Sequence, residues 1–335
     1  MHAVRLHAFG PAENLVYERT EDPVPGPGPG QVRIAVAAAG VHLLDTALRE
    51  GERGPYPEPV GLPTVPGREV AGTVESVGGG TDTAWLGKRV VAHIGMAPGG
   101  YAELTVTDAD RLHEIPEGLD AAGAVAMIGT GRTALGILGF TPLGPDSVAV
   151  VTAAAGGIGT LVVQYAKNAG ATVIALAGGP AKVARARADG ADLALDYTRP
   201  DWPRAAREHL EAAGLRATVV YDSVGGTTAR AAVDLLGPGG QHVVYGWSGE
   251  GLHDGGPLTF TDEELAERAI TSGAVLGPRM IEKGGGLRAL ETRALAEAAA
   301  GRLRPAVQRY PLAEAAAAHR ALETRGTMGK VVLEP

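Results

Sequence analysis

Short apolar segments separated by glycine and proline dominate the first third of the chain. Turn signals such as VPG at residues 65–67 and VGGG at residues 77–80 lie between these segments. Short strands at regular spacing with this punctuation predict a compact β-barrel or sandwich with few helices. The four clearest segments are VRIAV (32–36), EVAGTVESV (69–77), RVVAHI (89–94) and YAELTV (101–106).

The hydrophobic pattern changes near Asp120. A segment rich in small residues, 121–138, indicates a helix, and after Asp146 short continuous apolar runs alternate with helical segments. Continuous apolar runs are typical of parallel strands buried on both faces, so the pattern predicts an open, doubly wound sheet with GAVLG (273–277) as its sixth strand. The expected helices are 158–169, 181–188, 204–213 and 228–236, followed in the tail by 287–300 and 313–324.

The strongest chemical signal lies in residues 148–179, where a strand, the turn AAGGIG, a helix and a second strand follow one another. This is the pattern of a dinucleotide-binding unit, in which glycines let the backbone approach a pyrophosphate and the helix N-terminus attracts that anion. An alanine stands where the first glycine of GxGxxG would be. The alternative is a tight glycine-rich turn without a ligand. The cofactor-binding residues expected in this turn are Ala154, Gly156, Gly157, Ile158 and Gly159.

The end of the second strand bears on which nicotinamide cofactor binds. An NAD site places Asp or Glu there to hold the ribose hydroxyls. Here no acid occurs between Ala171 and Arg187, and the cations Lys182, Arg185 and Arg187 follow the strand instead. Cations without a repelling carboxylate favour the 2′-phosphate of NADPH over NADH. The alternative is that these cations form a solvated helix face.

Charge and composition exclude several classes of partner and site. The chain has 30 basic and 38 acidic residues, a net charge of −8, so it offers no broad basic surface for nucleic acid or anionic lipid. Its cysteine count of 0 removes disulfides, thiolate nucleophiles and sulfur-ligated zinc sites. We find neither a signal peptide nor a stretch of about 18 uncharged apolar residues. A soluble, cytoplasmic protein without nucleic-acid or membrane partners is therefore expected.

Several motifs in colinear order together resemble one known family. They are similar to the zinc-independent branch of the medium-chain dehydrogenase/reductases, and most of all to its NADPH:quinone oxidoreductases, the zeta-crystallin-like proteins. The likeness extends over nearly the whole chain. Besides the glycine turn, the motifs are VPGREVAGTV (65–74), GGYAEL (99–104), VVYDSVGG (219–226), LGPGGQHVVYG (236–246) and LETRGTMGKVVL (322–333).

The resemblance implies an α/β protein of two domains. A GroES-like, β-rich substrate domain would comprise residues 1–124 and 279–335, and a Rossmann domain with a doubly wound parallel sheet would comprise residues 125–278. The active site would lie in the cleft between them. The resemblance also implies a homodimer in which the sixth strands of two subunits pair edge to edge.

The resemblance assigns further cofactor contacts to named residues. Lys182, Tyr197 and Arg325 match the family's three contacts to the 2′-phosphate, in agreement with the charge argument above. Tyr245 and Gly246 match the segment near the cofactor after the fifth strand.

On the substrate side the chain departs from the family pattern. Thr133 matches the family's threonine beside the nicotinamide, and Asp45 is retained from the motif GVNFxDxY. His42 replaces the asparagine of that motif, and Ala47 replaces the tyrosine, which predicts a wider pocket. His42 either donates a proton to the acceptor, since an ordinary histidine titrates near neutrality, or fills the asparagine site and bonds to a backbone group. His42, Asp45 and Thr133 are the candidate catalytic residues.

No metal is expected. Zinc-dependent relatives carry GHE where this chain has Gly67, Arg68 and Glu69, and they also use cysteine ligands. His42 and His93 are two isolated histidines without further ligands nearby in the sequence.

Three functions stay open on these grounds. The first is an NADPH-dependent reductase of a small molecule that is already electron-poor, a quinone or an enone. The second is a reductase of the same superfamily acting on an enoyl thioester or a biosynthetic intermediate. The third is an NADPH-binding protein with little turnover.

Overall fold

The computed structural model describes residues 1–335 except 24–27, 53–60, 96–98 and 251–255. The chain forms two compact units, which we describe separately. Unit 1 contains Met1–Thr130, Ala294–Ala299 and Pro305–Pro335, and unit 2 contains Gly131–Arg293 and Ala300–Arg304.

Unit 1 is built on an antiparallel sheet to which the C-terminal strands add. Its strand order is β14-β15-β3-β4-β5-β7, with β6 paired to β3, and a separate hairpin pairs β1 with β2. Along β3 the side chains of Val32, Ile34 and Val36 alternate with more exposed neighbours, which is the two-residue period of a strand with one face in a core. The strands are β1 (His2–Leu6), β2 (Leu15–Arg19), β3 (Gln31–Val41), β4 (Glu69–Val77), β5 (Arg89–His93), β6 (Leu104–Asp108), β7 (His113–Glu114), β14 (Val307–Pro311) and β15 (Lys330–Glu334).

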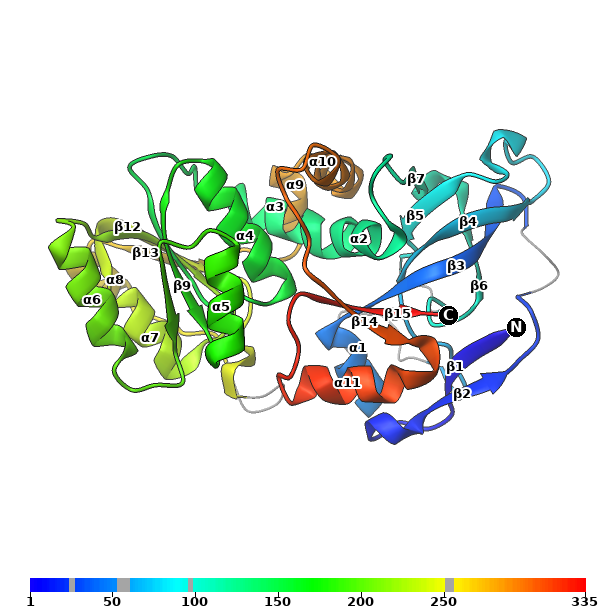
Figure 1. Ribbon diagram of the computed structural model, residues 1–335, viewed down its shortest axis with the longest axis horizontal. Coiled ribbons are helices and arrows are strands. Elements are labelled where there is room, and N and C mark those ends of the chain that lie inside the picture. Colours follow the sequence, from blue (N-terminus) through cyan, green and yellow to red (C-terminus); the bar gives the residue numbers. More distant parts are fainter. Residues whose placement is uncertain (24–27, 53–60, 96–98, 251–255) are drawn as a thin grey trace. The chain divides into compact units, whose positions relative to one another are not determined.

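Few helices accompany this sheet, as the sequence predicts. Helix α11, drawn in red, contacts α1 (Figure 1). The helices are α1 (Leu43–Glu50), α2 (Ala121–Val125) and α11 (Ala315–Glu323), with short 3-10 turns η1 (Ala12–Asn14), η2 (Thr83–Trp85), η3 (Ala109–Arg111) and η6 (Leu312–Glu314).

Unit 2 contains the predicted doubly wound sheet. Its six strands are all parallel in the order β10-β9-β8-β11-β12-β13, and α4 and α5 pack against β9. All four residues of β8 are buried, which explains the unbroken apolar run at this point of the sequence. The strands are β8 (Val148–Val151), β9 (Thr172–Ala177), β10 (Leu193–Asp196), β11 (Ala217–Asp222), β12 (Leu236–Val244) and β13 (Thr271–Ala274).

The helices predicted over 158–169, 181–188, 204–213, 228–236 and 287–300 are observed with closely similar ends, whereas α8 and α9 were not predicted. The helices with residues in unit 2 are α3 (Arg132–Leu138), α4 (Gly157–Asn168), α5 (Pro180–Ala188), α6 (Trp202–Ala212), α7 (Gly226–Val233), α8 (Asp262–Arg268), α9 (Pro278–Lys283) and α10 (Leu287–Ala299), with the 3-10 turn η5 (Ser248–Glu250). The last six residues of α10, Ala294–Ala299, belong to unit 1.

The helix predicted over 121–138 is interrupted. A π-helical turn, η4 (Ala126–Gly131), separates α2 from α3. By length and composition alone the whole stretch Ala121–Leu138 could cross a membrane, yet 83% of it is buried inside the protein, as in a core helix. Single π turns within α-helices are frequent at functional sites.

Several strand boundaries differ from the prediction. Strand β3 extends to Val41, beyond the predicted end at Val36. Strand β6 begins at Leu104 rather than at Tyr101, because the Tyr101 N–H donates to the carbonyl of Pro66 instead of joining the sheet. Strand β13 is Thr271–Ala274 rather than 273–277. Leu276, inside the predicted strand, is 48% exposed.

Candidate active site

The glycine turn of unit 2 connects β8 to α4. Ala153 adopts a left-handed φ of 45°, and the Gly156 N–H donates to the Ala153 carbonyl at 2.9 Å. A Cβ on Gly159 would collide with that same carbonyl oxygen, so this position requires glycine. The turn thus brings the first free N–H groups of a twelve-residue helix to the carboxyl end of β8. This arrangement is suited to a pyrophosphate.

Ala154 and Ile158 complete this turn. Ala154 is fully buried, and its N–H donates to the carbonyl of Leu176 in β9 at 3.0 Å. Ile158 is half-buried in the first turn of α4. Ala154 therefore fixes the turn against the neighbouring strand.

Lys182 and Tyr197 lie at the carboxyl ends of β9 and β10. A Cβ on Gly178 would be 3.3 Å from the Tyr197 hydroxyl oxygen, so Tyr197 borders the loop that leads into α5. Lys182 is half-buried in the first turn of that helix. Sequence reasoning missed Asp196, whose carboxylate accepts the Gly179 N–H at 2.9 Å. That hydrogen bond, followed by those from Thr198, lowers the pKa of Asp196.

Arg185 forms an ion pair with a neighbour on its own helix. Its guanidinium donates to the Asp189 carboxylate at 2.8 and 2.9 Å. Arg185 therefore already has a partner on its own helix. Arg187 is exposed and donates to the Ala194 carbonyl at 3.4 Å.

Tyr245 and Gly246 follow β12 at the same end of the parallel sheet as the glycine turn. The Tyr245 N–H donates to the Asp222 carbonyl at 2.8 Å, and a Cβ on Gly246 would be 3.2 Å from the Ser223 carbonyl oxygen. Arg325 belongs to unit 1, where it follows α11 with a left-handed φ of 57°.

A buried polar network that the sequence did not reveal holds the loop after β11. The fully buried Asp222 carboxylate accepts N–H groups of Val224 and Gly225 at 2.9 and 3.2 Å and the Thr152 hydroxyl at 3.2 Å. His242 Nε2 lies 3.3 Å from its second oxygen. The network fixes the carboxyl ends of three neighbouring strands.

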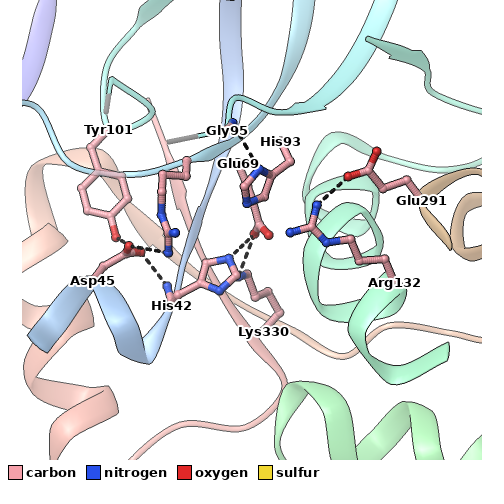
Figure 2. Close-up of polar contacts among 10 residues, drawn as sticks. His42, Asp45, Glu69, His93, Gly95, Tyr101, Arg132, Glu291 and Lys330 are labelled. Carbon is pink, nitrogen blue, oxygen red and sulfur yellow. Dashed lines mark hydrogen bonds and ion pairs between the residues drawn. The ribbon is translucent and has the colours of Figure 1, made fainter. Parts of the chain in front are cut away.

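Unit 1 contains a buried charge cluster at the start of β4. The Glu69 side chain is 0% exposed, and its Oε2 lies 2.7 Å from His42 Nε2 and 2.8 Å from Lys330 Nζ (Figure 2). The cluster joins the loop before α1, the first residue of β4 and the first residue of β15. Sequence reasoning singled out His42 but missed both partners. The signal was present in each case as a charged residue opening an apolar strand.

Two glycines make room for this carboxylate. A Cβ on Gly129, in the π turn, would overlap Glu69 Oε1, and a Cβ on Gly40 would meet Oε2 and Lys330 Cε. Backbone therefore packs directly around the carboxylate.

The electrostatic balance keeps Glu69 ionised. Burial opposes the charged form, but the charges of His42 and Lys330 outweigh it and hold the pKa of Glu69 well below its usual value. The cations beside Glu69 therefore favour its ionised form despite burial.

The buried Asp45 carboxylate accepts hydrogen bonds from groups within unit 1. It is 3% exposed, its Oδ2 accepts the His42 N–H at 2.8 Å and the Tyr101 hydroxyl at 3.1 Å, and Arg68 lies 3.5 Å from Oδ1 (Figure 2). Tyr101 also contacts the buried His319 at 3.2 Å. Asp45 thus caps α1 and fixes the backbone of His42. Its catalytic role stays a prediction.

The His42 side chain lies 2.7 Å from the Glu69 carboxylate, and it also forms a capping box with the Asp45 backbone N–H at the start of α1, which is the kind of backbone contact that one alternative expected. Thr133 is half-buried at the start of α3, next to Arg132, which pairs with Glu291 at 2.5 Å within unit 2. Ala47 is buried, at 6% exposed. The wider pocket expected at Ala47 and the role of Thr133 stay predictions.

Zinc does not fit the side chains at the Glu69 cluster. Among the described residues, no group of three His, Asp or Glu side chains is arranged to hold a metal ion. The Lys330 ammonium already lies against the carboxylate oxygen that such an ion would need. We derive no step through a metal.

Both units contain residues that match known protein families. The alcohol dehydrogenase GroES-like domain matches residues 28–117, and the zinc-binding dehydrogenase family matches residues 157–283. The quinone oxidoreductase of Pseudomonas aeruginosa is 34% identical over 342 residues, 99% of each chain. The 2-haloacrylate reductase of a Burkholderia species is 34% identical over 346 residues, 99% of this chain and 98% of that one.

A solved structure of a related protein has the same fold over its whole length. Escherichia coli quinone oxidoreductase complexed with NADPH matches with a TM-score of 0.82 and 28% identity, over 100% of both chains. These matches confirm the predicted combination of a GroES-like domain with a Rossmann domain.

Proposed function

Because the chain belongs to the zinc-independent medium-chain dehydrogenase/reductases, in the quinone oxidoreductase group that its motifs resemble, we propose that it reduces a quinone or an α,β-unsaturated carbonyl compound with NADPH and without a metal. The observation that carries the proposal is the glycine turn at the N-terminus of α4, where Gly159 cannot be replaced without displacing the backbone. A relative named for an activated alkene, the 2-haloacrylate reductase, supports the enone half of the substrate class.

Most of the proposed cofactor contacts lie at the carboxyl ends of β8, β9 and β10. Gly156, Gly157 and the first turn of α4 would bind the pyrophosphate, while Lys182 and Tyr197 would hold the 2′-phosphate of the adenosine. When bound, NADPH supplies the hydride. By the family resemblance, Arg325 would add a third contact to that phosphate.

The chain's own contribution to the chemistry is a proton. Addition of a hydride to an enone or quinone leaves negative charge on an oxygen, and a neutral product requires a proton there. We assign this proton to His42, whose side chain is 26% exposed beside the buried Glu69. Asp45 would hold the backbone of His42 in place.

We further propose that the enzyme is cytoplasmic and works as a homodimer. Strand β13 forms one edge of the sheet in unit 2, and Thr271, Gly273 and Ala274 in it are exposed. An edge strand of this kind offers unpaired backbone groups to a second copy.

The reaction is tested by following NADPH absorbance with a panel of quinones, enones and enoyl thioesters. We expect turnover with quinones or enones. Turnover confined to enoyl thioesters would replace the proposed substrate class, and NADPH binding without any turnover would favour a binding protein.

The cofactor assignment is tested by Lys182→Ala with Arg185→Ala as the matched control on the same helix. Loss of one charge-assisted contact, about 1.5–3 kcal/mol, should raise the dissociation constant of NADPH about 10- to 100-fold and leave that of NADH nearly unchanged. Arg185 already pairs with Asp189, so its removal should have little effect on either. Equal losses for both cofactors in Lys182→Ala would contradict the assignment.

A further inference from the structure

The hydroxyl of Tyr245 is a buried polar group without a partner. Tyr245 directly follows β12 and is 6% exposed, and among the described residues no group forms a hydrogen bond with its hydroxyl oxygen. A buried hydroxyl left in this way destabilises the folded protein. Because such groups are rare, each requires an explanation, and a ligand that completes the hydrogen bonding is one of them.

Ser223 is the polar side chain next to this phenol. Burial raises the pKa of Tyr245 above its usual value, the Ser223 hydroxyl opposes that shift, and the charge of Asp222 adds to it. The phenol is therefore protonated near neutral pH and is available as a donor. The two hydroxyls form no hydrogen bond in this structure, although Ser223 packs against Gly246, the residue after Tyr245.

The backbone of Ser223 is fixed on both sides, whereas the residue as a whole is half-buried. Its N–H donates to the Thr152 hydroxyl oxygen at 2.9 Å, and its carbonyl accepts the Ser248 N–H at 3.1 Å. Rotation about the Cα–Cβ bond is therefore the freedom that the Ser223 hydroxyl retains. Such a rotation brings the hydroxyl to the phenol without moving the main chain.

Ser223 and Tyr245 lie on the nicotinamide side of the proposed cofactor site. The sheet order places β9 and β10 on one side of β8, and β11 and β12 on the other. Lys182 and Tyr197, the proposed contacts of the adenosine 2′-phosphate, follow β9 and β10, and the glycine turn follows β8. A dinucleotide that lies across the carboxyl ends of these strands therefore has its nicotinamide half at β11 and β12.

We propose, on the basis of the function proposed above, that Ser223 and Tyr245 form a hydroxyl pair that binds an oxygen in the nicotinamide half of NADPH. The Ser223 hydroxyl donates to that oxygen, and the Tyr245 hydroxyl donates to Ser223 Oγ. Tyr245 is thus a positioning residue, and Ser223 is the contact. Ribose hydroxyls and the carboxamide carbonyl are the oxygens of this half that accept such a bond.

A purely structural role of Tyr245 makes a different prediction. If the ring only fills the core, removal of its hydroxyl changes the stability of the protein equally with and without NADPH. In a cofactor-binding pair, the same change removes an unpartnered group from the free protein but a hydrogen bond from the complex. The stability of the free protein and its affinity for NADPH then change in opposite directions.

The test compares Tyr245→Phe with the wild type by urea unfolding and by calorimetry. Without NADPH, the midpoint of unfolding should be higher in the variant because an unpartnered hydroxyl is gone. The dissociation constant of NADPH should rise about 3- to 10-fold, the effect of one neutral hydrogen bond. Adenosine 2′,5′-bisphosphate, which lacks the nicotinamide half, should bind the variant and the wild type equally.

Ser223→Ala decides whether the phenol acts through Ser223. This variant keeps the backbone hydrogen bonds of residue 223 and should weaken NADPH binding at least as much as Tyr245→Phe does. Adding Tyr245→Phe to it should change the dissociation constant by less than about twofold, because no hydroxyl is left to position. Full additivity of the two losses would contradict the pair.

The matched control is Tyr221→Phe. Tyr221 is 0% exposed, and its hydroxyl also has no hydrogen-bond partner among the described residues. The hydroxyl next to it, that of Thr141, donates to Gln241, which lies four residues before Tyr245 and so away from the carboxyl end of β12. The free protein should again become more stable, with an unchanged affinity for NADPH.

The outcomes separate this proposal from the proposed function. Unchanged NADPH affinity in Tyr245→Phe would overturn the hydroxyl pair, and so would a less stable free protein, since the hydroxyl would then already have a partner. If the wild type binds neither NADPH nor the bisphosphate, the proposed function fails. If the wild type binds both and Tyr245→Phe binds them equally well, the hydroxyl pair alone is rejected.

Discussion

At the scale of single residues, His319 is a histidine that the fold keeps neutral. It is fully buried on α11, and its Nε2 lies 3.2 Å from the Tyr101 hydroxyl. Burial lowers the pKa of His319 to about 4, an effect that Arg49 reinforces and Asp45 opposes. The imidazole is therefore neutral in the folded protein near neutral pH and carries a single ring proton.

This burial predicts a stability that depends on pH. Because the pKa is about 6.5 in the unfolded chain and about 4 in the folded protein, the unfolded state binds more protons between these values, and the free energy of unfolding falls as pH decreases through that window. Urea unfolding at pH 7.5 and 5.0 should show a loss of about 2 kcal/mol from this residue. His319→Gln should remove that part of the loss.

His7→Gln serves as the control, because His7 is exposed. Comparing the pH-dependent change in the free energy of unfolding of His319→Gln with that of His7→Gln cancels the contributions that the two variants share. An equal pH-dependent loss in wild type and His319→Gln would contradict the prediction.

Only some of the residues of the candidate site could be predicted from the sequence. His42 stood out because it departs from a motif, and the glycines of the turn stood out because their spacing is local. Glu69 and Lys330 did not, since their contact joins two strands far apart in the chain. A charge at the start of an apolar strand is usually solvated, and only the packing of Gly40 and Gly129 shows that this one is buried.

At the scale of elements, the turn into α4 depends on the missing side chain at Gly159. A methyl group there would collide with the Ala153 carbonyl and approach Ala154 Cα to 2.8 Å, so Gly159→Ala must displace the turn. Overpacking of this kind costs about 1–3 kcal/mol. We expect the NADPH dissociation constant, measured by calorimetry, to rise about tenfold.

Gly144→Ala is the matched control in the same unit, because nothing lies within 4 Å of the Cβ position there. It should leave NADPH binding unchanged. Wild-type affinity in Gly159→Ala would show that the turn does not bind the pyrophosphate.

Element boundaries could be predicted where local rules govern them. Helix α4 begins one residue from its predicted start because a glycine turn and an apolar period mark it. The π turn at Ala126–Gly131 could not be predicted, since small residues are compatible with an unbroken helix. Its position follows from packing, in which Gly129 accommodates Glu69.

At the scale of the whole molecule, local sequence patterns predict only some of the strand pairings. The alternation of strands and helices predicts the parallel sheet of unit 2. No local signal shows that β15, at the end of the chain, pairs with β3 in unit 1. Only the family resemblance predicted that the C-terminal segment rejoins the first domain. Pairing between strands so far apart in the sequence depends on the complete fold.

The last prediction concerns assembly through β13. Among the described strands β13 pairs with β12 alone, and the Val275 N–H donates to the Val244 carbonyl. Since successive N–H groups of a strand point to opposite sides, the Ala274 N–H points away from β12, to the side on which the proposed second copy would pair. Light scattering should therefore give about twice the mass of one chain for the wild type. Ala274→Pro removes the outward donor and keeps the bond to β12, so it should give the mass of one chain with NADPH binding retained; a wild type that is already monomeric would contradict the assembly.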